Sequence, residues 1–180
     1  MKNKKLYLTV YSAIFAALIC VATSIIYIPI PSGGYAHLGD GLVLLAGFCL
    51  PLPYAALAAG VGSLIADLFA GYALYAPATF IIKALCAVVA GLLYKAFKKL
   101  PIVLNLSFSA ICAELLMVGG YLFFEAVILS LGLGALGGIF GNAMQGCVGT
   151  LVGCILFLAL RKTRLIPKFN TPDQSSDKAS

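Results

Sequence analysis

Apolar segments fill most of this chain, and short stretches with proline, glycine or charged residues separate them. A helix needs about 20 predominantly apolar residues to cross the hydrocarbon core of a bilayer. Six segments fit this pattern, so the sequence predicts an all-α membrane protein, a six-transmembrane-helix bundle. The predicted spans are Leu6–Ile28, Gly39–Leu50, Tyr54–Gly71, Thr79–Phe97, Ile102–Leu131 and Gly134–Leu160.

Two of the predicted spans have unusual lengths. The second is short and ends before Pro51 and Pro53. Because proline removes a backbone donor, this pair marks either a turn between two spans or a kink at the inner surface. The fifth is too long for one helix perpendicular to the membrane, so it must tilt or include a loop near one end.

The positive charges lie in three groups, at the two chain ends and in the middle. Lysine and arginine collect on the cytoplasmic side of short loops. The groups therefore predict a multi-pass protein of the cell membrane with both termini in the cytoplasm, and they account for the net charge of +6 without a nucleic-acid partner. They are Lys2, Lys4 and Lys5, then Lys95, Lys98 and Lys99, and last Arg161, Lys162, Arg164 and Lys168.

The composition fits a chain that uses lipid as its solvent. Hydrophobic residues make up 62% of the 180 residues and charged residues 10%, more apolar surface than a soluble core of this size buries. The six cysteines are scattered through apolar segments without a Cys-x-x-Cys pair, which is untypical of a metal site or disulfide framework. Neither a Walker loop nor a recognisable Ser/His/Asp arrangement is present, so we expect no enzyme and no cofactor.

A few polar residues interrupt the apolar segments, and the first is Lys83. Charge placed inside a span is costly, which makes this residue a candidate for a site. The alternative is a structural ion pair with Asp67 or Asp40. His37 and Asp40 follow a glycine-containing turn, where they either contribute to a site or lie at the interface, with Asp40 as a favourable anion at a helix N-terminus.

The fifth span carries Glu114, Tyr121 and Glu125, whose offsets of seven and eleven residues place them within about 40° of one another on a helix. This stripe should face the bundle interior. Glu114 is nearest the membrane centre, where it either serves a site or forms a structural hydrogen bond, and Glu125 is expected near the outer surface, solvated by water.

Asn142 and Gln145 lie three residues apart in the sixth span, where they either bind a ligand or pin helices together. All of these polar groups belong to the outer half of the predicted bundle, and we expect none of the strongly polar residues in the inner half. Polar groups that converge in an apolar bundle favour a small-molecule pocket.

Three segments resemble the substrate-binding S components of energy-coupling factor (ECF) vitamin transporters. The size of the chain and the six predicted spans agree with this resemblance, which covers residues 6–162. The segments are Gly33-Gly-Tyr-Ala-His-Leu-Gly-Asp40, Gly60-Val-Gly-Ser-Leu-Ile-Ala-Asp67 and Tyr75-Ala-Pro-Ala-Thr-Phe-Ile-Ile-Lys83.

The resemblance implies a binding subunit that captures a small vitamin or vitamin precursor at the outer face. Such a subunit associates with a transmembrane coupling subunit and two ATPase subunits, which hydrolyse ATP, and topples in the membrane to release its substrate inside. Residues 1–165 would form the transmembrane substrate-binding domain, and residues 166–180 a disordered cytoplasmic tail.

The resemblance also assigns roles to residues by position. The implied substrate-binding residues are His37, Lys83, Glu114, Tyr121, Asn142 and Gln145. Docking to the coupling subunit would use the Ala-x-x-x-Ala pattern of Ala13 and Ala17. The segments look most like the subgroup assigned to hydroxymethylpyrimidine or pyridoxine, with riboflavin and pantothenate as alternatives, and the absence of tryptophan counts against thiamine. A ligand-free structural or regulatory membrane subunit is the competing interpretation.

Overall fold

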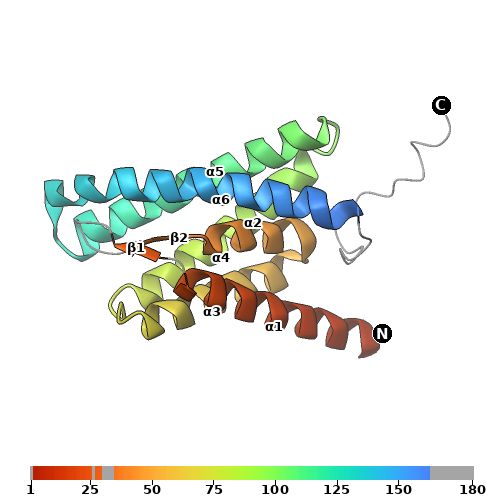
Figure 1. Cartoon of the computed structure of the whole chain (residues 1–180), viewed down its shortest axis with the longest axis horizontal. Helices are drawn as coiled ribbons and strands as arrows, with labels where there is room; N and C mark the ends of the chain where they lie inside the picture. Colours follow the sequence, from red (N-terminus) through yellow and green to blue (C-terminus); the bar gives the residue numbers. More distant parts are fainter. Residues whose placement is uncertain (1, 26, 30–34, 163–180) are drawn as a thin grey trace.

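The computed structural model describes residues 2–25, 27–29 and 35–162 (Figure 1). The predicted tail at 166–180 lies outside the described residues, and the domain boundary at residue 165 stays a prediction. The elements in chain order are α1 (Lys2–Ile25), β1 (Tyr27–Pro29), β2 (Tyr35–His37), α2 (Gly39–Cys49), α3 (Leu52–Phe69), α4 (Ala76–Ala96), α5 (Ile102–Phe123), the π-helix η1 (Phe124–Ile128), the 3-10 helix η2 (Gly132–Ala135) and α6 (Leu136–Lys162).

Helices dominate the described residues, and five of the helical segments are long and apolar enough to cross a membrane. These five contain α1, α3, α4, α5 and α6, so the prediction of a multi-pass helical membrane protein is confirmed. The second predicted span, Gly39–Leu50, coincides with α2, which has 11 residues and is too short for this criterion. The count of six transmembrane helices is therefore not confirmed.

Helix α2 lies in the middle of the bundle. It packs against α6, α4, α1 and α3, and Figure 1 shows it between the α5–α6 pair and the α1–α3 pair. Leu42 is its one residue that is not buried. A helix that is apolar on all sides needs this surrounding, because no face of it is suited to water.

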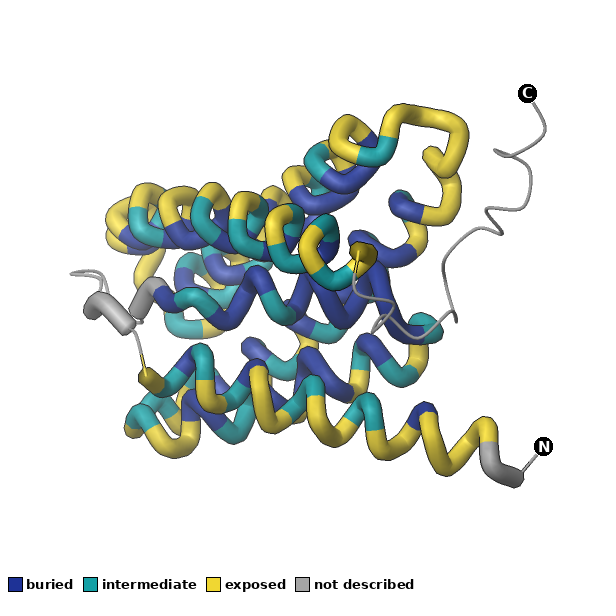
Figure 2. The backbone as a smooth tube through the Cα atoms, turned by 45° about the vertical axis from the view of Figure 1, so that its right-hand side comes forward, coloured by how far each residue is buried: buried dark blue, intermediate teal, exposed yellow. Residues whose placement is uncertain are grey.

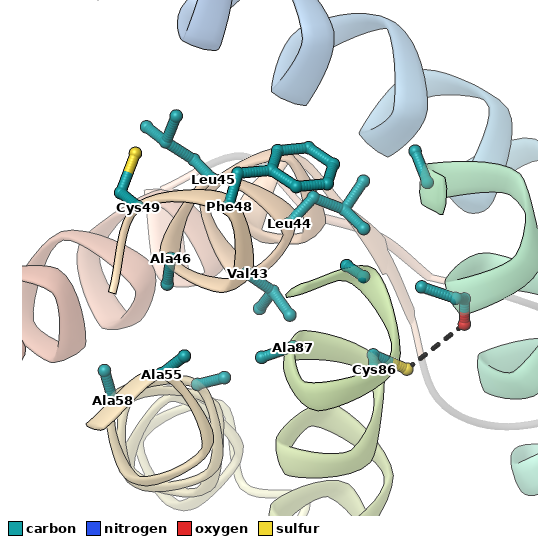
Figure 3. Close-up of a cluster of buried hydrophobic side chains, with 14 of the residues drawn as sticks. Val43, Leu44, Leu45, Ala46, Phe48, Cys49, Ala55, Ala58, Cys86 and Ala87 are labelled. Carbon is teal, nitrogen blue, oxygen red and sulfur yellow. Dashed lines mark hydrogen bonds between the residues drawn. The ribbon is translucent and has the colours of Figure 1, made fainter. Parts of the chain in front are cut away.

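Small residues let α2 approach its neighbours closely. The carbonyl oxygen of Ala87 lies where a side chain on Gly47 would be, and the carbonyl of Gly47 does the same for Gly91. Without a hydrophobic effect to drive helices together in lipid, such close backbone contact is a main source of packing energy. Figure 3 shows Val43 and Ala46 of α2 on the side that faces small residues of α3 and α4: Ala55, Ala58, Cys86 and Ala87.

Figure 2 shows that the long helices have exposed outward faces. Large apolar side chains are exposed on these helices, for example Leu18, Phe69, Leu115 and Phe140. In water a surface of this kind would drive association. In a bilayer it is the expected lipid-facing surface, so the exposed residues agree with membrane insertion.

A short antiparallel ribbon connects α1 to α2 and was not predicted. Strand β1 pairs with β2 in the register Tyr27↔His37 to Pro29↔Tyr35. The predicted first span reached Ile28, but α1 ends at Ile25. Pro29 explains the difference, because the residue before a proline is pushed from helical to extended backbone. Pairing in a ribbon satisfies backbone groups that would otherwise be unpaired beside the apolar bundle.

The predicted fifth span also ends early. Helix α5 stops at Phe123 and continues as the π-helix η1, after which Ser130 and Gly132 adopt positive φ angles of 56° and 54°. The long segment thus contains a turn at its outer end, one of the two predicted possibilities. Pro51 likewise marks a turn, since α2 and α3 are separate helices joined by extended backbone at Leu50.

Candidate functional site

The centre of the candidate site is Asp40, in the first turn of α2. We call the bundle end away from the exposed basic residues Lys95 and Arg161 the outer end. Lys83 of α4 donates from Nζ to Oδ1 of Asp40 at 2.5 Å, and Gln145 of α6 donates from Nε2 to Oδ2 at 2.6 Å. All three residues are buried, and Lys83 is 0% exposed. A buried carboxylate of this kind needs such partners, because ions without them pay a large desolvation cost.

Glu114 of α5 lies beside this group, next to two glycines of α6. A Cβ atom at Gly149 would be 2.7 Å from Cβ of Asp40 and 3.0 Å from Oε1 of Glu114. A Cβ atom at Gly146 would be 3.1 Å from Cβ of Glu114. Both glycines are therefore needed at their positions, because larger residues would displace the two acidic side chains.

Tyr121 of α5 covers the outer side of Lys83. Its ring centroid is 5.4 Å from Nζ of Lys83, within the range of a cation–π interaction. Its hydroxyl shares a hydrogen bond of 3.0 Å with Oγ1 of Thr79, which lies one turn before Lys83 on α4. We name Asp40, Lys83, Glu114, Tyr121 and Gln145 the acid–lysine cluster; it joins side chains of α2, α4, α5 and α6.

His37 at the end of β2 lies next to this cluster and is also buried. Its Nδ1 accepts a hydrogen bond of 3.1 Å from the backbone N–H of Gly39. Burial lowers the pKa of His37 to about 4, while the charge of Asp40 opposes the shift and that of Lys83 adds to it. The imidazole is therefore neutral near pH 7, with Nδ1 as acceptor and its proton on Nε2.

Asn142 lies on the same inward face of α6 as Gln145, one turn nearer the outer end. It is buried, and it forms no hydrogen bond to the acid–lysine cluster among the described residues. The structure thus brings together five of the six predicted substrate-binding residues, with His37 adjacent to the cluster and Asn142 apart from it. Their binding roles stay predictions.

Glu125 was expected near the outer surface and solvated by water. It lies near the outer end of the bundle, but the expectation that water solvates it was wrong. Its side chain is 2% exposed and accepts a hydrogen bond of 3.4 Å from the hydroxyl of Tyr75. Tyr75 precedes α4, and burial followed by the nearby Glu125 raises the pKa of its hydroxyl to about 12. The π-helix η1 contains Glu125, so this irregular turn decides where the side chain lies.

A second expectation, that the inner half lacks strongly polar residues, was also wrong. Asn105 of α5 is 2% exposed and donates from Nδ2 to the carbonyl oxygen of Tyr94 at 2.9 Å. Ser109 in turn donates to Oδ1 of Asn105 at 3.2 Å. These groups bond to each other and to a carbonyl near the end of α4, a region where helices leave carbonyls without partners.

Ala13 and Ala17 lie on the exposed face of α1. The opposite face packs on α3, where Ser12 donates to the carbonyl oxygen of Tyr54 and the backbone of Ala16 lies against Gly62. The two alanines are therefore not used in contacts that hold this bundle together.

Sequence reasoning underrated Asp40, which it considered as a helix-terminal anion and as one possible partner of Lys83. The pairing with Lys83 is the signal that identifies Asp40, because a lysine inside an apolar stretch needs an anionic partner. Thr79 was missed as a partner of Tyr121, although its position four residues before Lys83 places both on one helix face. Among the described residues, no group of His, Cys, Asp or Glu side chains is arranged to hold a metal ion.

The fold and the cluster define a class: a multi-pass helical membrane protein with charged groups enclosed among its helices. Comparisons with known proteins assign the chain to a family within this class. Residues 3–162 match the family model described as ECF-type riboflavin transporter, S component, and the chain belongs to this family of transporter subunits, which are not enzymes. The chain is also 30% identical over 145 residues to a Pyrococcus woesei protein described as an uncharacterized protein in the gap 3′ region, covering 80% of this chain and 95% of that protein.

Proposed function

We propose that this protein is the substrate-binding subunit of an ECF-type importer and that its acid–lysine cluster binds a small vitamin or vitamin precursor taken from the outer face. The observation that carries the proposal is the convergence of buried polar side chains from four helices at one depth of an apolar bundle. Charges inside a membrane are expensive and are retained mainly for function. Family membership supports the same role.

Hydroxymethylpyrimidine or pyridoxine is the favoured substrate. The family match does not distinguish this subgroup, so the assignment rests on the resemblance of the quoted segments, and the site supports it. The hydrogen-bonding groups of the cluster are concentrated around Asp40, with both partners of its carboxylate within 2.6 Å. A compact group of this kind suits a single ring with a few polar substituents. Riboflavin is the second candidate, because the matching family is described by that vitamin. Pantothenate is a third.

We further propose that the subunit associates with a transmembrane coupling subunit and with two ATPases, whose ATP hydrolysis supplies the energy for transport. The subunit would topple in the membrane to release its substrate inside. Both termini would lie in the cytoplasm, on the side of the exposed basic residues. The exposed face of α1 with Ala13 and Ala17 is the proposed docking surface, since small residues allow close helix approach in lipid.

Equilibrium binding to the purified full chain tests the proposal. Hydroxymethylpyrimidine, pyridoxine, riboflavin, pantothenate and thiamine would be titrated into protein in detergent or nanodiscs, without ATP. We expect one compound to bind tightly; a nanomolar dissociation constant would correspond to about −12 kcal/mol. If none of the five binds to protein that is shown to be folded, the chain is better explained as a ligand-free structural or regulatory subunit.

A further inference from the structure

The cluster contains oxygen atoms that no described residue satisfies. Oε2 of Glu114 and Oε1 of Gln145 are buried and have no hydrogen-bond partner among the described residues. Both side chains are more than nine-tenths buried, at 6% and 3% exposed. Leaving such atoms unpaired is costly, because they lose the hydrogen bonds that they would form in water, so they indicate where a bound molecule would form hydrogen bonds.

The orientation of the Gln145 amide follows from its neighbour. An ionised carboxylate only accepts hydrogen bonds, so Asp40 requires the NH₂ group of the amide, as the bond from Nε2 shows. The amide oxygen is then the free end. Gln145 therefore presents its amide oxygen to the site as an acceptor, with one N–H of the amide held by Asp40.

The charged residues around the site also disfavour an anionic ligand. Lys83 is the one buried cation among the described residues, and it already neutralises Asp40. His37 is neutral, and Glu114 adds a second acidic group next to Asp40. Two of the six acidic residues, Asp173 and Asp177, lie beyond the described range, and the others are all buried: Asp40, Asp67, Glu114 and Glu125. An anion entering here would meet acidic side chains and no free buried cation among the described residues, because Lys83 is already paired with Asp40.

We propose that the site selects a substrate that donates hydrogen bonds and carries a positive or zero charge, and that it rejects carboxylates and phosphates. This inference rests on the proposed function and names the chemical class of its substrate. A ring amino group, a protonated ring nitrogen or a hydroxyl would donate to Glu114 and Gln145, while Lys83 stays on Asp40. An aminopyrimidine or a pyridine alcohol has these groups, and pantothenate, with its carboxylate, does not fit.

Matched ligand pairs test the selectivity. The first pair is pyridoxine and 4-pyridoxate, in which a carboxylate replaces one hydroxymethyl group. The second is 4-amino-5-hydroxymethyl-2-methylpyrimidine and the same pyrimidine without its amino group. We expect the donor compound of at least one pair to bind ten times or more tightly than its partner, since a hydrogen bond to a charged group has about this value.

A variant separates recognition from structure. Glu114→Gln replaces one carboxyl oxygen with an amide NH₂ donor, so the preference for the donor compound should shrink at least about fivefold. Glu125→Gln is the control. Oε2 of Glu125 is also buried without a hydrogen-bond partner among the described residues, but Glu125 lies in η1 outside the cluster, so this variant should keep the preference. A purely structural Glu114 would weaken both members of a pair equally.

The outcomes distinguish the two proposals. If pantothenate or 4-pyridoxate binds best, or if Glu114→Gln leaves the preference unchanged, the selection for donors is wrong while a binding function stands. If riboflavin alone binds, the proposal that the substrate carries no negative charge stands. The Glu114→Gln and Glu125→Gln variants are then compared with riboflavin and its anionic 5′-phosphate as the ligand pair. If no compound binds to folded protein, the proposed function itself fails.

Discussion

The two ends of helix α2 have opposite surroundings. At its inner end, Phe48 packs against Tyr94 and Phe157, with ring centroids 5.4 and 5.7 Å away. The polar groups of Asn105 and Ser109 in the inner half are hydrogen-bonded. At its outer end, Asp40 joins a cluster that still contains unpartnered oxygens. One end is built for packing, and the other keeps hydrogen-bonding capacity that packing does not use.

The contrast suggests a division of roles along one helix. Close-packed apolar interiors stabilise a fold, whereas unsatisfied buried polar groups reduce stability and are expected at functional sites. The inner half of α2 would then be the scaffold that holds its outer end at the depth of Lys83. Variants in the two regions should therefore fail in different ways.

The largest effect is expected at the ion pair. Replacing Lys83 with Met leaves Asp40 buried with only Gln145 as a partner, which should destabilise the protein by about 3–5 kcal/mol. Thermal unfolding in detergent measures it. Adding Asp40→Asn removes the uncompensated charge, so the double variant should recover part of the loss. A double variant as unstable as the single one would contradict this account of the pair.

Protonation of His37, the single histidine of the chain, should weaken the outer region in acid. Its pKa of about 4 in the folded protein is below the usual 6.5, so the unfolded state binds more protons between these values. Its contribution is complete above pH 6.5 and is lost as the pH falls to about 4, by at most about 3 kcal/mol. His37→Gln should remove this part of the pH dependence of unfolding. An unchanged profile would show that the ring is not protonated on unfolding.

Because the inner region is closely packed, Gly47→Ala should reduce the stability of the protein, but by less than Lys83→Met. The added methyl group would lie 2.5 Å from the carbonyl oxygen of Ala87, and overpacking of this kind costs about 1–3 kcal/mol. Gly119→Ala is the matched control, because no atom lies within 4 Å of the added group. The two melting temperatures should differ clearly, with Gly119→Ala at or above the wild type. Equal values would mean that α2 is not tightly packed.

Docking should be separable from both regions. Ala13→Leu and Ala17→Leu add bulk on the exposed face of α1, so we expect normal ligand binding and melting but cellular uptake reduced by at least about tenfold. Ala143→Leu, an exposed position on α6, is the control for the same change in contact with lipid. Normal uptake by both α1 variants would place the docking surface elsewhere.

Hydropathy predicted the long helices because lipid exposure leaves a strong signal in each segment. It did not predict the ribbon β1–β2 or the π-helix η1, which depend on Pro29 and on tertiary contacts of Glu125. The polar residues of the site could be selected from the sequence, since each interrupts an apolar segment. The sequence left open whether Asp67 or Asp40 pairs with Lys83, because that choice depends on how the short α2 packs inside the bundle.

The most direct test measures affinity and melting temperature side by side for Glu114→Gln in the cluster and Asn105→Ala in the inner half. Glu114→Gln should weaken binding of the identified ligand by at least about tenfold and leave melting near the wild type. Asn105→Ala should do the reverse, losing about 1–3 kcal/mol of stability because the Tyr94 carbonyl loses its donor, with affinity unchanged. If both variants change the same property, the division between a ligand-binding outer end and a structural inner end is wrong.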